Sequence, residues 1–340
     1  LSYLDCQIEL SDLNLKNKLI KVLKNYSDIF SKHNLDVGCS SAIMAHIEAD
    51  PKLLKPEKPR PLPADKLHEL KIIVKEMEKA GIIMKANGHH LSMMHNILLV
   101  PKNNRLQGTK ADKYINKHLG IKTSKFRFCS DLRGVNKAIV NNTALAMPSP
   151  DEIVSKLSGK IVSSVDVTSA FFSIRLTEQS RSLMGFFVDK NLYTYCRMPQ
   201  GLSVSPGIYL ALMEITFSNE IMQAIKKNNR HLVSLPDSFE SFLSYFVDDI
   251  YIGSDTEEDH ILHLEATFLA LQMGALKISP DKCHFFASNI KILGVHLDVK
   301  RSELSLELAK AQAILEWPRP DSLYTLQSRL YALVYFQKFI

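Results

Sequence analysis

Two adjacent acidic residues lie within an apolar, strand-forming stretch in the C-terminal half of the sequence. Asp248 and Asp249 follow Tyr245-Phe246-Val247 and precede Ile250-Tyr251-Ile252-Gly253. An ionised carboxylate is costly to hold in apolar surroundings unless a cation or a metal ion pairs with it. The other interpretation is an exposed Asp-rich hairpin turn, because Asp is a favoured turn residue. The pair alone therefore indicates either a cation site or a turn.

A third carboxylate ends a separate apolar segment. Asp166 closes the run Ile161-Val162-Ser163-Ser164-Val165, and the aromatic pair Phe171-Phe172 follows it. Two strands that each deliver a carboxylate suggest a shared metal site, since oxygen ligands suit Mg²⁺ and two such ions can hold the attacking and leaving oxygens of phosphoryl transfer in line. Asp166 as an ordinary strand-end residue is the alternative.

The elements that must position these acids can be predicted from periodicity and turn residues. Residues 239–251 form a predicted hairpin with Asp248 and Asp249 at its bend, and 160–166 a predicted strand. Helices are predicted over 65–80 and 201–216, and after a Ser254-x-x-Glu257 capping box. Further short strands are expected at 81–84, 96–100 and 126–131, and the proline-rich stretch 50–63 should be extended. Strands and helices alternate without a regular βαβ repeat, which favours an α+β fold.

Composition limits the class of protein further. The chain has 340 residues, 46% of them hydrophobic, so it can fill a substantial core. Lys and Arg outnumber Asp and Glu by 42 to 36, which is compatible with a polyanionic partner. No apolar run approaches the ~18 residues of a membrane span, and the first residues lack a signal-peptide pattern. We therefore expect an intracellular, cytoplasmic protein without membrane contact, and the start at Leu1 suggests a piece of a longer polyprotein.

Neither the cysteines nor the clustered histidines predict a zinc site. The five cysteines are scattered and never form a Cys-x-x-Cys pair, which also argues against a disulfide framework. His89, His90 and His95 stand in a polar connector without cysteine partners, so they are interpreted as loop residues. The lysine-rich stretch 102–125 is interpreted as an exposed excursion between two strands.

Seven blocks of the sequence, in order, resemble the reverse transcriptases of gypsy-like LTR retrotransposons and, more distantly, the retroviral enzymes. The resemblance extends over nearly the whole chain, and Trp317-Pro318-Arg319-Pro320 and Tyr335–Ile340 are similar to the family's thumb. The seven blocks are Gly81-Ile82-Ile83, Arg127–Asn136, Ser164–Leu176, Met198–Leu202, Phe246–Asp249, Leu276–Cys283 and Ile292-Leu293-Gly294.

The resemblance implies a right-hand polymerase with fingers, palm and the beginning of a thumb. The expected boundaries are an N-terminal extension and linker at 1–61, fingers at 62–145 and 175–204, palm at 146–174 and 205–300, and thumb from 301 to 340. Ile292-Leu293-Gly294 matches the family's primer-gripping hairpin, although such residues can also be simple core.

The same resemblance assigns the acids and one lysine to the chemistry. Asp166 and Asp248 become the principal ligands of two Mg²⁺ ions, for which Mn²⁺ can substitute, and Asp249 completes the acidic triad. Lys282 matches a residue proposed to protonate the leaving pyrophosphate, with a surface lysine as the alternative.

Three further residues are expected to bind the incoming nucleotide. Arg127 matches an arginine that grips the triphosphate, a role suited to a planar, permanently charged donor. Gln200 matches a residue near the incoming sugar and base pair, and Phe171 an aromatic ring that excludes a ribose 2′-hydroxyl. The alternatives are a surface arginine, an ordinary turn and simple packing, respectively.

Three departures from the family pattern accompany the resemblance. Phe246 stands where the family usually has Tyr, so any contact of a hydroxyl there is lost. The 102–125 excursion is longer than the usual fingers hairpin, which leaves open whether Lys102 binds triphosphate. Ser205 replaces a common Ala before Pro206, a small change.

The function implied is RNA-directed DNA polymerase activity on an RNA or DNA template with a primer and dNTPs. RNase H, protease and integrase domains are expected in a parent polyprotein or are absent, and a retroelement particle or the nucleus is an alternative location. Two rivals stay open: a catalytically inactive, retroelement-derived nucleic-acid-binding or structural protein, and a viral RNA-dependent RNA polymerase, against which the bulk of Phe171 argues.

Overall fold

The computed structural model describes residues 6–88, 90–101, 124–140, 148–157, 160–292, 295–299, 301, 303–306 and 308–335. Most of the lysine-rich excursion, His89, the last two residues of Ile292-Leu293-Gly294, and residues 336–340 therefore lie outside the described residues.

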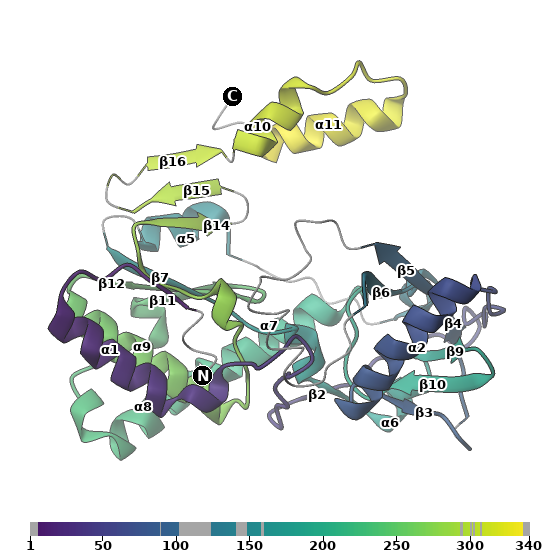
Figure 1. Cartoon of the computed structure of the whole chain (residues 1–340), viewed down its shortest axis with the longest axis horizontal. Helices are drawn as coiled ribbons and strands as arrows, with labels where there is room; N and C mark the ends of the chain where they lie inside the picture. The colour runs from purple at the N-terminus through teal and green to yellow at the C-terminus, as the bar shows by residue number, and fades with distance from the viewer. Residues whose placement is uncertain are drawn as a thin grey trace.

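A five-stranded sheet forms the centre of one lobe (Figure 1). Its strand order is β1-β13-β7-β12-β11, with β7 in the middle, antiparallel to both of its neighbours. The strands are β1 (Gln7–Ile8), β7 (Ile161–Asp166), β11 (Leu243–Phe246), β12 (Asp249–Ser254) and β13 (His284–Ala287). The middle position encloses β7 on both edges, so the strand that ends at Asp166 is held by two ladders.

The two faces of this sheet are covered by different elements, as Figure 1 shows. One face carries α1 (Leu13–Asn25), α8 (Asn219–Asn228) and α9 (Glu257–Met273), and the other carries α5 (Pro150–Leu157) and the small sheet β14-β15-β16. Alternation along β7 follows this division, since Val165 belongs to the main core and Val162 packs with Ile153 and Leu157 of α5. Side chains two or four residues apart on a strand point to the same face, so Asp166 lies on the same face of β7 as Val162, the face covered by α5.

A second lobe is built on the four-stranded sheet β3-β10-β9-β4 (Figure 1). It also holds the β5–β6 ribbon and α2, while α7 runs between this lobe and the central sheet. The bounds are α2 (Ala64–Lys79), β3 (Ile83–Lys85), β4 (Met94–His95), β5 (Ile97–Pro101), β6 (Phe126–Ser130), α4 (Arg133–Ala138), α6 (Glu178–Arg181), β9 (Gly185–Val188), β10 (Asn191–Tyr195) and α7 (Ser205–Thr216).

The remaining elements connect or extend these lobes. β2 and β8 form a parallel pair, short 3-10 turns connect neighbouring elements in the described part of the chain, and the C-terminal helices lie beyond the small sheet (Figure 1). Their bounds are η2 (Ser27–Ile29), β2 (Met44–Ala45), η4 (Ala170–Ser173), β8 (Arg175–Leu176), η5 (Arg230–Leu232), η6 (Phe239–Ser241), η7 (Pro280–Lys282), β14 (Asn289–Ile292), β15 (Val295–Asp298), β16 (Glu303–Leu306), α10 (Leu308–Leu315) and α11 (Leu323–Tyr335).

Among all described residues, no helix is both long and apolar enough to cross a membrane.

The N-terminal segment is part of the central core. Asp12 caps α1 by accepting a hydrogen bond from the Leu15 backbone N–H at 2.9 Å, and the buried stripe Leu15, Leu19, Val22 and Leu23 packs the helix on the core. β1 adds a parallel strand to the edge of the sheet beside β13. Residues expected to form a separate extension thus complete the sheet that carries the acids.

Three local predictions were wrong. The hairpin bend consists of Val247, with φ of +52°, and Asp248, whereas Asp249 already belongs to β12. The N-cap of α9 is Thr256, whose hydroxyl accepts from the Asp259 N–H at 3.1 Å, because Ser254 still belongs to the strand. His95 is a buried strand residue stacked on Tyr195, and not a loop residue.

Ser254 instead joins a buried network of two histidines behind the sheet. His260 lies 2.7 Å from the hydroxyls of both Ser163 and Ser254, and His263 lies 2.7 Å from Ser254 and stacks on Phe242. Burial lowers the pKa of His260 to about 3 and of His263 to about 4. Both rings are therefore neutral in the folded protein at pH values where an unfolded histidine is charged.

This network predicts an acid-dependent loss of stability. Below pH 6.5 the unfolded histidines take up protons that the folded ones do not, so lowering the pH from 7.5 to 5 should cost about 2 kcal/mol of unfolding free energy for each ring. Other groups titrate in the same pH range, so the test compares a variant with the wild type. In urea unfolding, the loss of unfolding free energy between pH 7.5 and pH 5 should be smaller by about 2 kcal/mol in His260→Gln. The exposed His68→Gln is the control. An identical pH dependence in His260→Gln and the wild type contradicts the interpretation.

Candidate active site

Strand pairing brings the predicted acids together at one end of the central sheet. Asp166 at the end of β7 is the direct partner of Asp249 at the start of β12. Asp248 precedes Asp249 at the bend, and its carbonyl accepts a hydrogen bond from the Val167 N–H at 2.8 Å. Residues more than 80 positions apart in the sequence are thus fixed side by side by backbone ladders.

The acids are poorly solvated and repel one another. Burial raises the pKa of Asp166, against the charge of Lys282, and Asp248 adds to the rise. Burial, followed by the charges of Asp248 and Asp166, raises the pKa of Asp249 to about 6. Carboxylates that are harder to ionise than normal mark a site with excess negative charge, which a cation would relieve.

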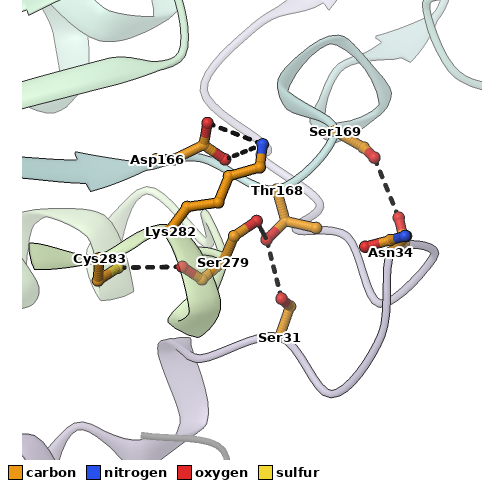
Figure 2. A network of polar contacts seen from close by, with 8 residues as sticks. All are labelled: Ser31, Asn34, Asp166, Thr168, Ser169, Ser279, Lys282 and Cys283. Atoms are coloured by element: carbon orange, nitrogen blue, oxygen red, sulfur yellow. Dashed lines mark hydrogen bonds and ion pairs between the residues drawn. The ribbon is translucent and has the colours of Figure 1, made fainter. Parts of the chain in front are cut away.

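Lys282 supplies one positive charge to this group. It ends the short turn η7, and its Nζ lies 2.9 and 3.0 Å from the two carboxylate oxygens of Asp166 (Figure 2). Burial alone would lower its pKa, but the charge and hydrogen bond of Asp166, with Asp248 and Asp281, raise it. The Lys282 side chain is still 58% exposed, whereas that of Asp166 is only 12% exposed. The ammonium group is therefore charged and remains accessible from solvent.

Divalent metal ions suit the chemistry of this group but not its present arrangement. Carboxylate oxygens are the ligands that Mg²⁺ prefers, and their raised pKa values indicate a demand for positive charge. However, among the described residues no three acidic, histidine or cysteine side chains converge closely enough to hold a metal ion. Both oxygens of Asp166 are engaged by Lys282, so a metal ion that binds there would compete with the ammonium group for this carboxylate.

Phe171 packs on a tyrosine to which the sequence pattern assigned no role. It belongs to η4, is half-buried, and meets Tyr209 of α7 edge to face, with ring centroids 5.7 Å apart. Tyr209 is fully buried, and its hydroxyl has no hydrogen-bond partner among the described residues. Burial raises the pKa of this phenol, and the charges of Asp248 and Asp166 raise it further. The only sequence signal was its position on the apolar face of the predicted helix, observed as α7.

Gln200 is exposed on a firmly held turn. Gly201 follows it with φ of +95°, a conformation that favours glycine, and the Asn136 side chain donates to the Gly201 carbonyl at 2.9 Å. Asn136 also accepts from the Ser203 N–H, and Ser205 donates to the Pro199 carbonyl. Asn136 stood in one of the seven sequence blocks without a role, and its contacts show that it fixes this turn.

Arg127 lies in a different lobe from the acids. It is exposed on β6, paired with Val100 in the β5–β6 ribbon of the second lobe (Figure 1). Lys102, the other residue considered for triphosphate binding, lies outside the described residues. The acids therefore belong to the central sheet and Arg127 to the second lobe.

Comparison with known proteins agrees with this geometry. Residues 101–297, more than half of the chain, match the family model described as "Reverse transcriptase (RNA-dependent DNA polymerase)". The chain is 26% identical over 268 residues to the "Retrovirus-related Pol polyprotein from transposon gypsy" of Drosophila melanogaster, covering 78% of this chain and 22% of that protein. It is 24% identical over 281 residues to the "Transposon Tf2-7 polyprotein" of Schizosaccharomyces pombe, covering 82% and 18% respectively. The chain thus spans about a fifth of the curated relatives that it matches.

Solved structures share the fold. The foamy viral protease-reverse transcriptase in complex with RNA/DNA hybrid aligns with a TM-score of 0.70 at 20% identity, covering 96% of this chain and 38% of that one. The foamy viral protease-reverse transcriptase "dRH" in complex with double-stranded DNA aligns with a TM-score of 0.72 at 20% identity, covering 96% and 50%. The expected α+β polymerase fold is therefore confirmed, and the chain belongs to the reverse transcriptase (RNA-dependent DNA polymerase) family.

Proposed function

We propose that this chain is a polymerase core that extends a primer on an RNA or DNA template, using dNTPs and two Mg²⁺ ions, with Mn²⁺ as a possible substitute. The observation that carries the proposal is the pairing of Asp166 with Asp249 across β7 and β12, with Asp248 at the adjoining bend and Lys282 on Asp166. Family membership supports the reaction type.

The proposed roles follow from the chemistry of each side chain. Asp166 and Asp248 hold the metal ions and Asp249 completes the acidic set. Bound Mg²⁺ supplies positive charge for the triphosphate and lowers the pKa of the primer 3′-hydroxyl. Lys282 keeps a proton that it can donate to the leaving pyrophosphate, because its pKa is raised and its side chain is largely exposed.

The nucleotide would be held by residues from both lobes. Arg127 would bind the triphosphate through its planar guanidinium group. Gln200, on its fixed turn, would lie near the sugar and base pair. Phe171, supported by Tyr209, would fill the space that a ribose 2′-hydroxyl requires. In this proposal the central sheet is the palm, the second lobe is the fingers, and residues from 301 onward begin the thumb.

The proposed template-primer would be recognised mainly through its phosphates. The formal net charge of +6 is compatible with a polyanion, and the aligned foamy viral structures contain RNA/DNA hybrid or double-stranded DNA. Binding of this kind is sensitive to salt and nearly independent of sequence.

Asp248→Asn tests the catalytic assignment. It should lower primer extension on poly(rA)/oligo(dT) with dTTP and Mg²⁺ by on the order of 100-fold or more, because metal ligation contributes several kcal/mol to such reactions. Asp255→Asn is the matched control, since Asp255 lies just beyond β12 with a side chain that is 81% exposed. Equal extension by wild type and Asp248→Asn refutes the assignment, and a folded but inactive wild type favours an inactive remnant.

Phe171→Val tests sugar selection. It should raise the use of UTP relative to dTTP by about 10- to 200-fold, the range over which a pocket discriminates small groups. Phe172→Val is the neighbouring control, because Phe172 stacks on Tyr195 instead of Tyr209. The measurement is kcat/KM for both nucleotides on one template, with a melting curve for each variant. If Phe171 only packs the core, both substrates lose activity together and the ratio stays constant.

Arg127→Ala tests triphosphate binding. Losing a charge-assisted contact should raise KM for dNTP by roughly 10- to 100-fold, while the affinity for template-primer changes little. Lys190→Ala removes one exposed positive charge from the β9–β10 turn of the same lobe and is the control. A fall in duplex affinity at constant KM for dNTP places Arg127 on the nucleic-acid path instead.

A further inference from the structure

The N-terminal turn at residues 29–36 packs directly against the two backbone segments that present Asp166 and Lys282. Phe30 forms a parallel bridge with Ile278, whose N–H donates to the Ile29 carbonyl and whose carbonyl accepts from the Ser31 N–H, each at 2.9 Å. Ile278 in turn bridges Val167, the residue after Asp166. Three chain segments far apart in sequence therefore meet in one small ladder below the acids.

A chain of three buried hydroxyl groups crosses this ladder (Figure 2). The Thr168 hydroxyl donates to the Ser31 hydroxyl at 2.9 Å and lies 3.0 Å from the Ser279 hydroxyl. Ser31 and Ser279 are each 6% exposed and Thr168 3%. Because each hydroxyl has a single proton, Thr168 is committed to Ser31, and Ser279 must be the donor in its contact with Thr168.

Ser279 is connected to both members of the Asp166–Lys282 pair. Its N–H donates to the Asp166 carbonyl at 2.8 Å, and its carbonyl accepts from the Lys282 N–H and the Cys283 thiol, each at 3.1 Å (Figure 2). The position of the η7 turn, and with it the start of the Lys282 side chain, is therefore set by contacts of Ser279. Among the contacts of Ser279 described here, only its hydroxyl group contacts Thr168.

Two further contacts fix the N-terminal turn to the same place. The Ser169 hydroxyl donates to the Asn34 carbonyl at 3.0 Å (Figure 2), and Lys277 Nζ lies 2.6 Å from Asp36 Oδ1. These contacts hold the turn from both sides of the hydroxyl chain.

We propose that Thr168 and Ser279, anchored on Ser31, are positioning residues that keep the Lys282 ammonium group on Asp166. The N-terminal turn thereby controls how strongly Lys282 competes with a divalent cation for that carboxylate. This inference rests on the proposed function, in which Asp166 is a metal ligand. It assigns a role to the N-terminal segment that the polymerase reaction itself does not require.

The inference predicts two changes of opposite sign. Thr168→Val removes the hydroxyl and keeps the side-chain shape, so Lys282 should be held less well on Asp166. Mn²⁺ should then bind more tightly, by about tenfold, the lower end of the effects seen when outer contacts of metal ligands are changed. Primer extension should nevertheless fall by a similar factor, because the proton donor is less well placed.

The measurement is the Mn²⁺ affinity of the folded protein without nucleic acid or nucleotide, followed by electron paramagnetic resonance, with kcat for primer extension measured separately. Lys282→Met, which removes the competing charge, sets the upper limit for tighter Mn²⁺ binding. Thr168→Ser retains the hydroxyl and should restore both values. Thr267→Val is the matched structural control, because Thr267 is fully buried and its hydroxyl donates to the His263 carbonyl within its own helix, α9.

Weaker or unchanged Mn²⁺ binding in Thr168→Val overturns the inference, as does tighter binding that Thr267→Val reproduces. Absence of Mn²⁺ binding in both wild type and Lys282→Met removes its premise and overturns it as well. A wild type that binds Mn²⁺ but does not extend a primer contradicts the proposed function alone, and the order of Mn²⁺ affinities then still decides the inference.

Discussion

The repulsion between buried carboxylates at the end of the central sheet is the constraint on which the rest of the structure depends. Asp166 and Asp249 are direct partners in neighbouring strands, and Asp248 adjoins them. Such a group is stable only if rigid elements prevent the charges from moving apart, since desolvation and like charge both oppose it. β7 provides this rigidity because both of its edges are paired, and Lys282 offsets part of the charge.

The two faces of the central sheet make different kinds of contact near the acids. On the face of α9, Ser163 contacts His260, and Ser254 contacts both His260 and His263, so the strands that end or begin at the acids are tied to the helix through polar groups kept neutral by burial. On the other face, Asp166 shares its parity with Val162, which packs under α5. Asp166 and Asp249 therefore belong to the face that α5 covers, while the strands that carry them are tied to α9 on the opposite face.

Local sequence signals predicted the elements but not their irregular ends. Apolar patterns predicted a helix over 65–80 and a strand over 160–166, each within a residue of the observed α2 (Ala64–Lys79) and β7 (Ile161–Asp166), because burial of one face or both dictates such patterns. The hairpin bend was misplaced because a β-branched residue such as Val247 rarely adopts positive φ, and propensity therefore favours the aspartates there. Ser254 was misread as a cap because its real partners, His260 and His263, depend on how α9 packs against β12.

The contrast between local sequence signals and contacts made by packing also applies to the candidate site residues. Carboxylates inside apolar runs stand out, so Asp166, Asp248 and Asp249 could be singled out as candidates, although the residues alone left a turn or a strand end open. Serine and threonine are common on surfaces, and the contacts of Thr168 with Ser31 and Ser279 join positions 137 and 111 residues apart. No local pattern encodes such contacts, because they exist only after three segments have packed together.

This dependence on distant segments bears on where the functional unit begins. The family model matches residues 101–297, which include the acids, Lys282 and Ser279 but neither Ser31 nor Asp36. Yet β1 completes the central sheet, α1 packs on α9, and the N-terminal turn pairs with Ile278 beside the acids. Removing that segment would expose the buried side of the ladder and leave the hydroxyl of Thr168 and the ammonium group of Lys277 without the partners they have here, at a cost that burial of polar groups makes substantial. The residues that pack around the acids therefore extend beyond the region by which the family is recognised.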